Sequence, residues 1–230
     1  MIKKHIPNII TSGNLVSGCI GISFALQENF LAAAYCIAIA AVLDFFDGLV
    51  ARLLRVHSEI GKQLDSLADM VTFGVLPSFI MFSYLNLAGA ENWRFIAFLI
   101  AVFSAFRLAK FNIDTRQSDQ FIGLPTPANA LFIGALCFIK DWQQLNFLFT
   151  KTGLSVIVII FSVLLVAKLP MIALKFKNFK LAENLFRYLL ILGALILLVL
   201  FQFSAIPLVI LYYLFLSIIQ NLMTPKKLKA

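Results

Sequence analysis

The sequence LAAAYCIAIAAVLDFFDGLVARLLRVHSEIGKQLDSLAD, residues 31–69, determines both the fold class and the kind of site to expect. Leu31–Leu54 is long and apolar enough to cross a bilayer as a helix, which takes about 20 residues. Four carboxylates nevertheless lie in or beside the hydrocarbon, at Asp44, Asp47, Asp65 and Asp69. Ionisable side chains there are costly, and they usually line a cavity, pair with one another or bind ions. The stretch therefore predicts a membrane protein with a functional site where one helix ends and the next begins.

The composition of the whole chain agrees with this prediction. Of its 230 residues, 61% are hydrophobic and only 13% are charged, and the mean hydropathy is +0.95. A soluble domain would be about half apolar and about a quarter charged. Apolar runs recur from end to end, which leaves no room for a separate soluble domain of about 100 residues. We therefore expect an all-α integral membrane protein that forms one domain over residues 1–230.

Eight segments are predicted to span the membrane. They are Ile9–Leu26, Leu31–Leu54, Leu64–Leu87, Phe95–Phe111, Ala128–Ile139, Leu154–Leu174, Leu185–Phe203 and Ile206–Leu222. The fifth is shorter than a typical span and on length alone fits a re-entrant segment equally well. If it crosses, only Arg94, Lys140 and Lys151 lie opposite the termini; if it does not, the Lys and Arg divide almost evenly. Because cytoplasmic loops carry the excess of these cations, eight spans with both termini cytoplasmic are favoured.

The charge balance narrows the class of partner. The chain carries 19 Lys and Arg against 11 Asp and Glu, a formal net charge of +8. Such an excess is typical of nucleic-acid binding or of membrane topology, and the apolar composition favours the second, with membrane lipids as partners and no nucleic acid. The first apolar run lacks a small-residue cleavage site and is interpreted as a retained span. We expect a multi-pass protein of the plasma membrane with its site facing the cytoplasm.

Helical spacing brings the four aspartates together. At 100° per residue, Asp44 and Asp47 lie within an arc of about 100° that also holds Gly48 and Ala51. The second pair of aspartates is one turn apart on the following helix. Four carboxylates can thus converge between two antiparallel helices, although salt bridges to the nearby Arg and Lys side chains are an alternative explanation for each of them.

Such a site offers oxygen ligands only. Hard divalent cations, Mg²⁺, Mn²⁺ or Ca²⁺, are favoured over zinc because no His or Cys is in reach by sequence. Four negative charges would offset two divalent ions, and a two-metal clamp is a known device for phosphoryl displacement. Small residues on the same elements allow a ligand to approach the backbone, and Arg52 offers a fork for a phosphate.

The pattern resembles a known family signature. It reads Asp44-x2-Asp47-Gly48-x2-Ala51-Arg52-x8-Gly61-x3-Asp65-x3-Asp69, and it is similar at every position to that of the CDP-alcohol phosphatidyltransferases. The resemblance implies that the four aspartates are divalent-metal ligands and that Asp69 is also the general base. It implies that Gly48, Ala51 and Gly61 line the CDP pocket with Arg52 near the phosphates, and that the enzyme forms a homodimer.

Three further segments resemble the phosphatidylserine synthase branch of this family. They are Pro7–Thr11 with Asn14, the run DSLADMVTFGVLP at 65–77, and RLAKFN at 107–112 followed by GLPTP at 123–127. Asn8 and Thr11, in the first of them, are expected to bind the CDP-lipid. The resemblance implies transfer of the phosphatidyl group from CDP-diacylglycerol to L-serine, with release of CMP. Lys110 replaces the Arg of many relatives and keeps its charge.

The acceptor site is predicted from charge. A zwitterionic amino acid needs a cation for its carboxylate, and Arg107, Lys110 and Arg116 are predicted on the same side as the aspartates. The alternative is that these are ordinary positive-inside residues.

Two other functions stay open on the sequence. The same chemistry with glycerol 3-phosphate or inositol phosphate as acceptor would need a denser cationic pocket. A cation transporter could also use intramembrane carboxylates. The position of all four acids at the cytoplasmic end and the lack of visible half-repeats argue against the transporter.

Overall fold

The computed structural model describes residues 5–56, 58–113, 121–174, 176, 178 and 180–223, and these are almost entirely helical. The first half contains α1 (His5–Leu26), α2 (Phe30–Leu54), α3 (Glu59–Asp69), α4 (Leu76–Leu87) and α5 (Leu99–Ile113). The second half contains α6 (Thr126–Gly134), α7 (Lys151–Val166), α8 (Leu181–Phe201) and α9 (Ala205–Met223). A π-helical segment, η2 (Met70–Val75), joins α3 to α4, and the 3₁₀ segments are η3 (Arg94–Phe98), η5 (Ala135–Phe138), η6 (Gln143–Phe149) and η7 (Gln202–Ser204).

Five helical stretches in the described residues are long and apolar enough to cross a membrane, which confirms the prediction of a helical membrane protein. They are His5–Leu26, Phe30–Leu54, Glu59–Leu87, Arg94–Ile113 and Glu183–Met223. A sixth is counted if η6 and α7, which meet at an angle of 71°, form one span.

The count of eight spans depends on two segments that length alone does not decide. Glu183–Met223 is divided at Gln202, where φ is 51°, and its two parts, α8 and α9, pack side by side. Tyr212 Oη donates a hydrogen bond to Leu189 O across this pair at 3.1 Å. The predicted fifth span lies in Thr126–Phe138, which at about 1.5 Å per residue is shorter than the roughly 30 Å hydrocarbon core.

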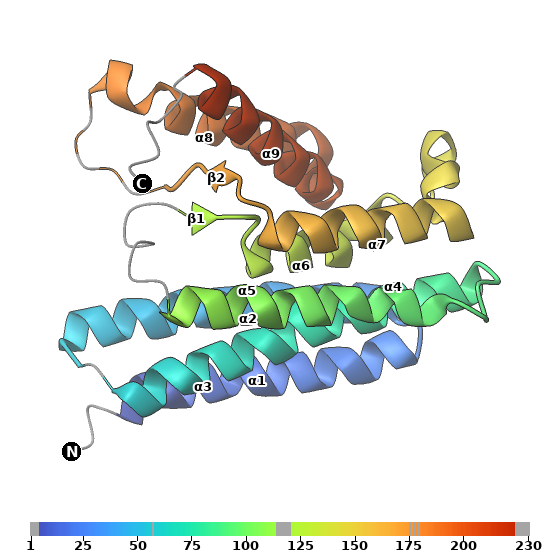
Figure 1. Cartoon of the computed structure of the whole chain (residues 1–230), viewed down its shortest axis with the longest axis horizontal. Coiled ribbons are helices and arrows are strands. Elements are labelled where there is room, and N and C mark those ends of the chain that lie inside the picture. Colours follow the sequence, from blue (N-terminus) through green and yellow to red (C-terminus); the bar gives the residue numbers. More distant parts are fainter. Residues whose placement is uncertain are drawn as a thin grey trace.

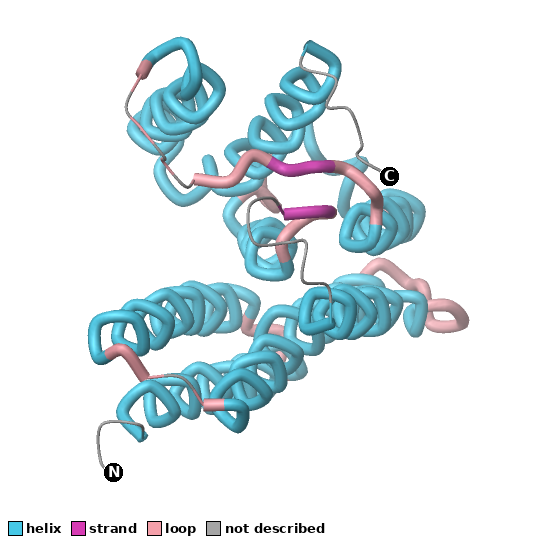
Figure 2. Tube along the Cα trace, turned by 60° about the vertical axis from the view of Figure 1, so that its left-hand side comes forward, coloured by secondary structure: helices cyan, strands magenta, loops and turns pink. Residues whose placement is uncertain are grey.

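The predicted sixth span, Leu154–Leu174, is wrong at its C-terminal end. The helix α7 ends at Val166, and the chain continues as the short strand β2 (Pro170–Met171). This strand pairs antiparallel with β1 (Phe121–Ile122), as Figure 2 shows. Proline has no backbone N–H and disfavours a helical conformation in the residue before it, so the helix could not have continued through Pro170 although the sequence stays apolar.

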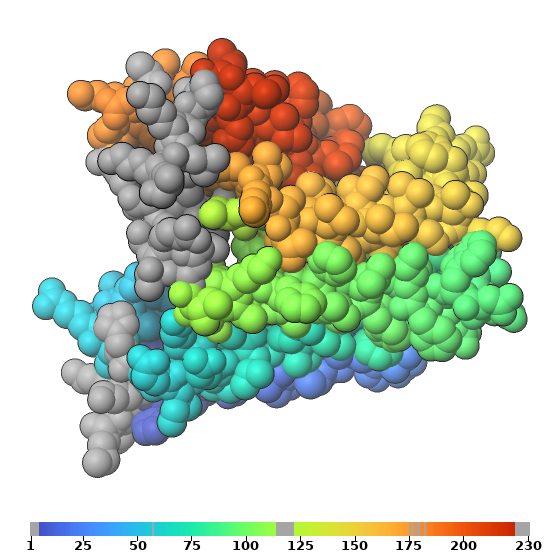
Figure 3. Space-filling view, viewed as in Figure 1, coloured from blue at the N-terminus to red at the C-terminus, as the bar shows by residue number. Residues whose placement is uncertain are grey.

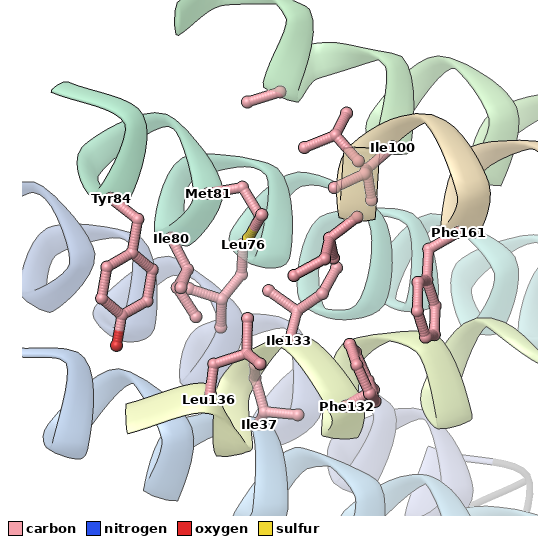
Figure 4. Packing of buried hydrophobic residues seen from close by; sticks show 14 of the residues in the cluster. Ile37, Leu76, Ile80, Met81, Tyr84, Ile100, Phe132, Ile133, Leu136 and Phe161 are labelled. Carbon is pink, nitrogen blue, oxygen red and sulfur yellow. The ribbon is translucent and has the colours of Figure 1, made fainter. Parts of the chain in front are cut away.

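The helices form two groups that run roughly along one long axis (Figure 1). In the first group the continuous helix of α3, η2 and α4 contacts α1 on one side and α5 on the other. The second group begins with α6 and α7, and α5 and α7 lie against each other along the surface in Figure 3. Between the groups, Leu76, Ile80 and Met81 of α4 pack near Ile133 of α6 and Leu136 of η5 (Figure 4). This core fixes the helix that carries half of the aspartates.

Candidate metal and nucleotide site

A short reversal between α2 and α3 brings the signature residues together. α2 ends at Leu54, and the next residue, Arg55, caps it: its φ of 51° is left-handed, and its N–H donates to the Ala51 and Arg52 carbonyls. Ser58 begins α3 by accepting a hydrogen bond from Gly61 N at 3.3 Å. A side-chain oxygen at this position satisfies an otherwise unpaired N–H of the first turn. The end of α2 and the start of α3 therefore lie at the same end of the molecule (Figure 1).

Three of the four aspartates form one compact group of ligand atoms. One carboxylate oxygen each from Asp44, Asp47 and Asp65 lies within 4.8 Å of the others. Asp69 is one turn further along α3 than Asp65 and lies outside this group. The Asn14 amide Nδ2 donates to Asp69 Oδ1 at 3.5 Å. The arrangement is a group of three carboxylates with a fourth beside it.

Protein cations do not neutralise this group within the described part of the chain. Among the described residues, Lys180 forms an ion pair with Glu183, far from the site in the sequence. No described Arg or Lys forms an ion pair with any of the four aspartates. Arg52 turns back on its own helix, and its Nε donates to Gly48 O at 2.9 Å. Thr11 Oγ1 donates to Asp47 Oδ2 at 2.7 Å, which is a neutral contact. The salt-bridge alternative is therefore not seen for the described Arg and Lys, and an oxygen-only group of uncompensated carboxylates fits a hard divalent cation.

A pocket of about 260 Å³ opens beside the carboxylates, where α1 begins and α2 and α3 meet. It is lined by Pro7, Asn8, Thr11, Asp47, Gly48, Ala51, Val56, Ser58, Gly61, Lys62 and Asp65. A Cβ placed on Gly61 would lie 3.0 Å from Asn8 Oδ1, so a side chain there would crowd the pocket wall. The pocket thus combines small residues, polar groups and two of the three grouped aspartates.

The first helix packs very closely behind the site. A Cβ on Gly18 would overlap Thr72 Oγ1, and this hydroxyl donates to Asn14 O at 3.2 Å. Thr72 belongs to the π-helical η2, which follows Asp69 directly. π-helical turns are rare and occur frequently at functional sites.

The family model described as CDP-alcohol phosphatidyltransferase matches residues 4–223, nearly the whole chain. The chain belongs to this family. It is therefore an enzyme of the CDP-alcohol phosphatidyltransferase class, and the signature at 44–69 lies within the matched residues.

Several relatives are similar over most of this phosphatidyltransferase. The CDP-diacylglycerol–serine O-phosphatidyltransferase of Helicobacter pylori is 36% identical over 192 residues, which cover 81% of this chain and 78% of that protein. The protein of the same name from Bacillus subtilis is 37% identical over 188 residues, or 79% and 96% of the two chains. The archaetidylserine synthase of Methanothermobacter thermautotrophicus is 30% identical over 161 residues, or 67% and 66%.

The structure of this phosphatidyltransferase brings most of the expected CDP-binding residues together. Asn8, Thr11, Gly48, Ala51 and Gly61 all line the pocket. Arg52 does not line it and is held on its own helix instead.

The residues expected to bind the acceptor are separated. Arg107 on α5 is buried, with 8% of its surface exposed. Lys110, one turn further on, is exposed. Arg116 lies outside the described residues.

Sequence reasoning did not assign three polar residues to the site. Ser58 and Lys62 line the pocket, and Lys62 Nζ donates to Asn112 O at 3.2 Å, which ties α3 to the end of α5. Asn14 contacts Asp69 across a separation that no local pattern reveals. The position of Lys62 directly after Gly61 of the signature could have indicated that it lines the pocket.

Proposed function

We propose that this enzyme transfers the phosphatidyl group of CDP-diacylglycerol to the hydroxyl of L-serine and releases CMP. The observation that carries the proposal is the group of Asp44, Asp47 and Asp65, uncompensated by described cations and adjoining a pocket of about 260 Å³. The printed names of the relatives support the donor and the acceptor.

The four aspartates are proposed to hold two divalent cations, Mg²⁺ or Mn²⁺, with Ca²⁺ as a further candidate. The donor set supports this assignment because it is made of carboxylates alone and lies partly buried between two helices. Bound cations would supply Lewis-acid stabilisation for the charge of the pyrophosphate.

The chain's own residues then perform the proton transfer and the positioning. Asp69 accepts the proton of the serine hydroxyl, whose oxygen forms a bond to the lipid-side phosphorus. The bond from this phosphorus to the bridging oxygen breaks, and CMP leaves with the electron pair. Asn8, Thr11 and the small residues Gly48, Ala51 and Gly61 shape the nucleotide pocket. We propose that the acyl chains of the donor stay in the bilayer.

We also propose eight membrane crossings in the plasma membrane, with both termini and the active site cytoplasmic. Support comes from the side-by-side packing of α8 and α9 and from the excess of Lys and Arg on one side. The start of α1 and the end of α9 lie at the end of the molecule where α2 meets α3 (Figure 1). The family resemblance supports a homodimer, which the mass of the detergent-solubilised protein would test.

The experiment is an acceptor screen with purified protein in detergent. CMP release from CDP-diacylglycerol is measured with Mn²⁺ or Mg²⁺ and with L-serine, glycerol 3-phosphate, inositol phosphate or no acceptor. We expect metal-dependent release with L-serine alone. Release with another acceptor would refute the serine assignment, and no release from folded protein would favour an ion-binding transporter.

A further inference from the structure

Two buried polar atoms beside Asp69 have no hydrogen-bond partner among the described residues. One is Asn14 Oδ1 on α1, and the other is Arg107 Nε on α5. Asn14 is fully buried, and Arg107 is 8% exposed. Leaving a buried polar atom unpaired lowers stability, and more so where the group is charged, so such atoms call for an explanation.

Asn14 is fixed next to Asp69 from the α1 side. Its Nδ2 donates to Asp69 Oδ1, and its backbone carbonyl accepts the hydroxyl of Thr72. The first contact orients the amide with Nδ2 toward Asp69, and the second fixes only the backbone of Asn14. In this orientation Oδ1 has no hydrogen-bond partner among the described residues and is free to accept. Asn14 does not line the nucleotide pocket, and neither does Asp69.

Arg107 reaches the same level from the α5 side. Asn112 of α5 donates to Ser66 Oγ of α3 at 2.8 Å, and Ser104 lies against Gly74 of η2. These two contacts show that α5 runs antiparallel to α3 and η2. They place Arg107 at the level of the residues that directly follow Asp69.

We propose that Asn14, Arg107 and Asp69 form a three-point pocket for the acceptor, in which Asn14 binds the ammonium group of an α-amino acid. Arg107 binds its carboxylate, and Asp69 faces its hydroxyl. The inference rests on the proposed function and adds Asn14 as a specificity-determining residue. It places the acceptor on the far side of the carboxylates from the nucleotide pocket.

The chemistry of the three groups matches one class of acceptor. An unpaired carbonyl oxygen accepts from an ammonium group, and a buried guanidinium binds a carboxylate strongly. Glycerol 3-phosphate or inositol phosphate would present a dianion where Arg107 is the cation named in this site, and would offer Asn14 Oδ1 a neutral hydroxyl in place of an ammonium group. A site with an unpaired buried group discriminates strongly against a substrate that cannot satisfy it.

The test compares L-serine with two analogues that each lack one charge. Serinamide has no carboxylate, and 3-hydroxypropionate has no ammonium group. The variants are Arg107→Gln, Asn14→Leu and the milder Asn14→Ser. We measure kcat/KM for each acceptor, or the inhibition constant of an analogue that is not turned over, together with the KM for CDP-diacylglycerol.

Each variant should lose one preference and keep the other. For Arg107→Gln, the ratio of kcat/KM for L-serine to that for serinamide should fall about tenfold or more. For both Asn14 variants, the ratio of kcat/KM for L-serine to that for 3-hydroxypropionate should fall by about the same factor. The ratio isolates the ammonium contact, because any effect on Asp69 is common to both acceptors. The KM for CDP-diacylglycerol should change less than about threefold.

Two controls separate binding from structure. Ser17→Ala removes a buried hydrogen bond of α1 to Cys36 O, and Arg55→Asn removes an exposed cation at a left-handed position. Neither should alter the preferences. Unchanged preferences in the Asn14 and Arg107 variants of an enzyme that uses L-serine would overturn this inference alone. Wild-type enzyme that uses another acceptor instead of L-serine would overturn the proposed function as well.

Discussion

The helix of residues 59–87 and the helical pair of residues 183–223 use apolar side chains in opposite ways. Over their most apolar windows, 61% of the first is buried inside the protein and only 11% of the second, although the second is the more apolar. In water the more apolar segment would be the more deeply buried. In a bilayer, lipid solvates apolar side chains. Helices that carry polar and small residues therefore pack against other helices, and the most apolar helices face the lipid.

This contrast places function in the first region. Asp65, Asp69 and the π-helical η2 belong to residues 59–87, where α1 and α5 enclose them from two sides. The α8–α9 pair contributes mainly an apolar outer surface, with Val199 at 81% exposure. Substitutions should therefore differ in effect between the two regions.

The largest effect is expected at the proposed base. Asp69→Asn removes the group that accepts the serine proton, and we expect kcat to fall about 100- to 10,000-fold. Glu59→Gln, which neutralises an exposed acid on the same helix, should stay within about twofold of wild type. Ordinary turnover by Asp69→Asn would remove this residue from the base role.

A second large effect is expected on metal dependence. A chelator should abolish activity, and added Mn²⁺ or Mg²⁺ should restore it. Asp47→Asn removes one ligand from the group and should raise the Mn²⁺ concentration for half-maximal activity about tenfold or more. An unchanged metal titration, with Glu59→Gln as the reference, would contradict the assigned ligands.

A stability comparison tests the inverted burial itself. Leu76→Ala empties a fully buried position and should lower the free energy of unfolding by about 2–5 kcal/mol. Val199→Ala changes a side chain on the outer surface and should alter it by less than about 0.5 kcal/mol. The midpoints of thermal unfolding of both variants in detergent measure these changes. Equal losses of stability in the two variants would mean that the α8–α9 surface is covered by protein.

The smallest effect is expected where the pocket wall is tight. Gly61→Ala brings a Cβ to 3.0 Å from Asn8 Oδ1 and should raise the KM for CDP-diacylglycerol about three- to tenfold. Gly13→Ala on α1 is the matched control, since a Cβ there would make an ordinary contact at 3.4 Å with Leu43. Equal KM values in the two variants would argue that the pocket does not hold the nucleotide.

Sequence spacing predicted the part of the site that is local in the chain. Asp44 and Asp47 share a helical face, and the turn before Ser58 is short, so the convergence with Asp65 follows from helix geometry. Asn14 reaches Asp69 from a different helix, and hydropathy carries no information on such packing.

The fold shows the same division between local and long-range information. The apolar pattern located the helices, yet it placed the end of α7 too late, because the run stays apolar through Pro170. It also could not decide the span count, because Thr126–Phe138 is too short to be counted by length. The helix α7 gives way to the paired strand β2 instead, and the count of eight spans is a proposal.

The most direct test of the central claim is incorporation of isotopically labelled L-serine into extractable lipid by purified enzyme supplied with CDP-diacylglycerol. The wild type should form labelled lipid and CMP in equal amounts with Mn²⁺ or Mg²⁺, and neither with a chelator. Asp65→Asn should form neither above background. Labelled lipid formed without metal, or at wild-type rates by Asp65→Asn, would contradict the carboxylate group as the catalytic centre.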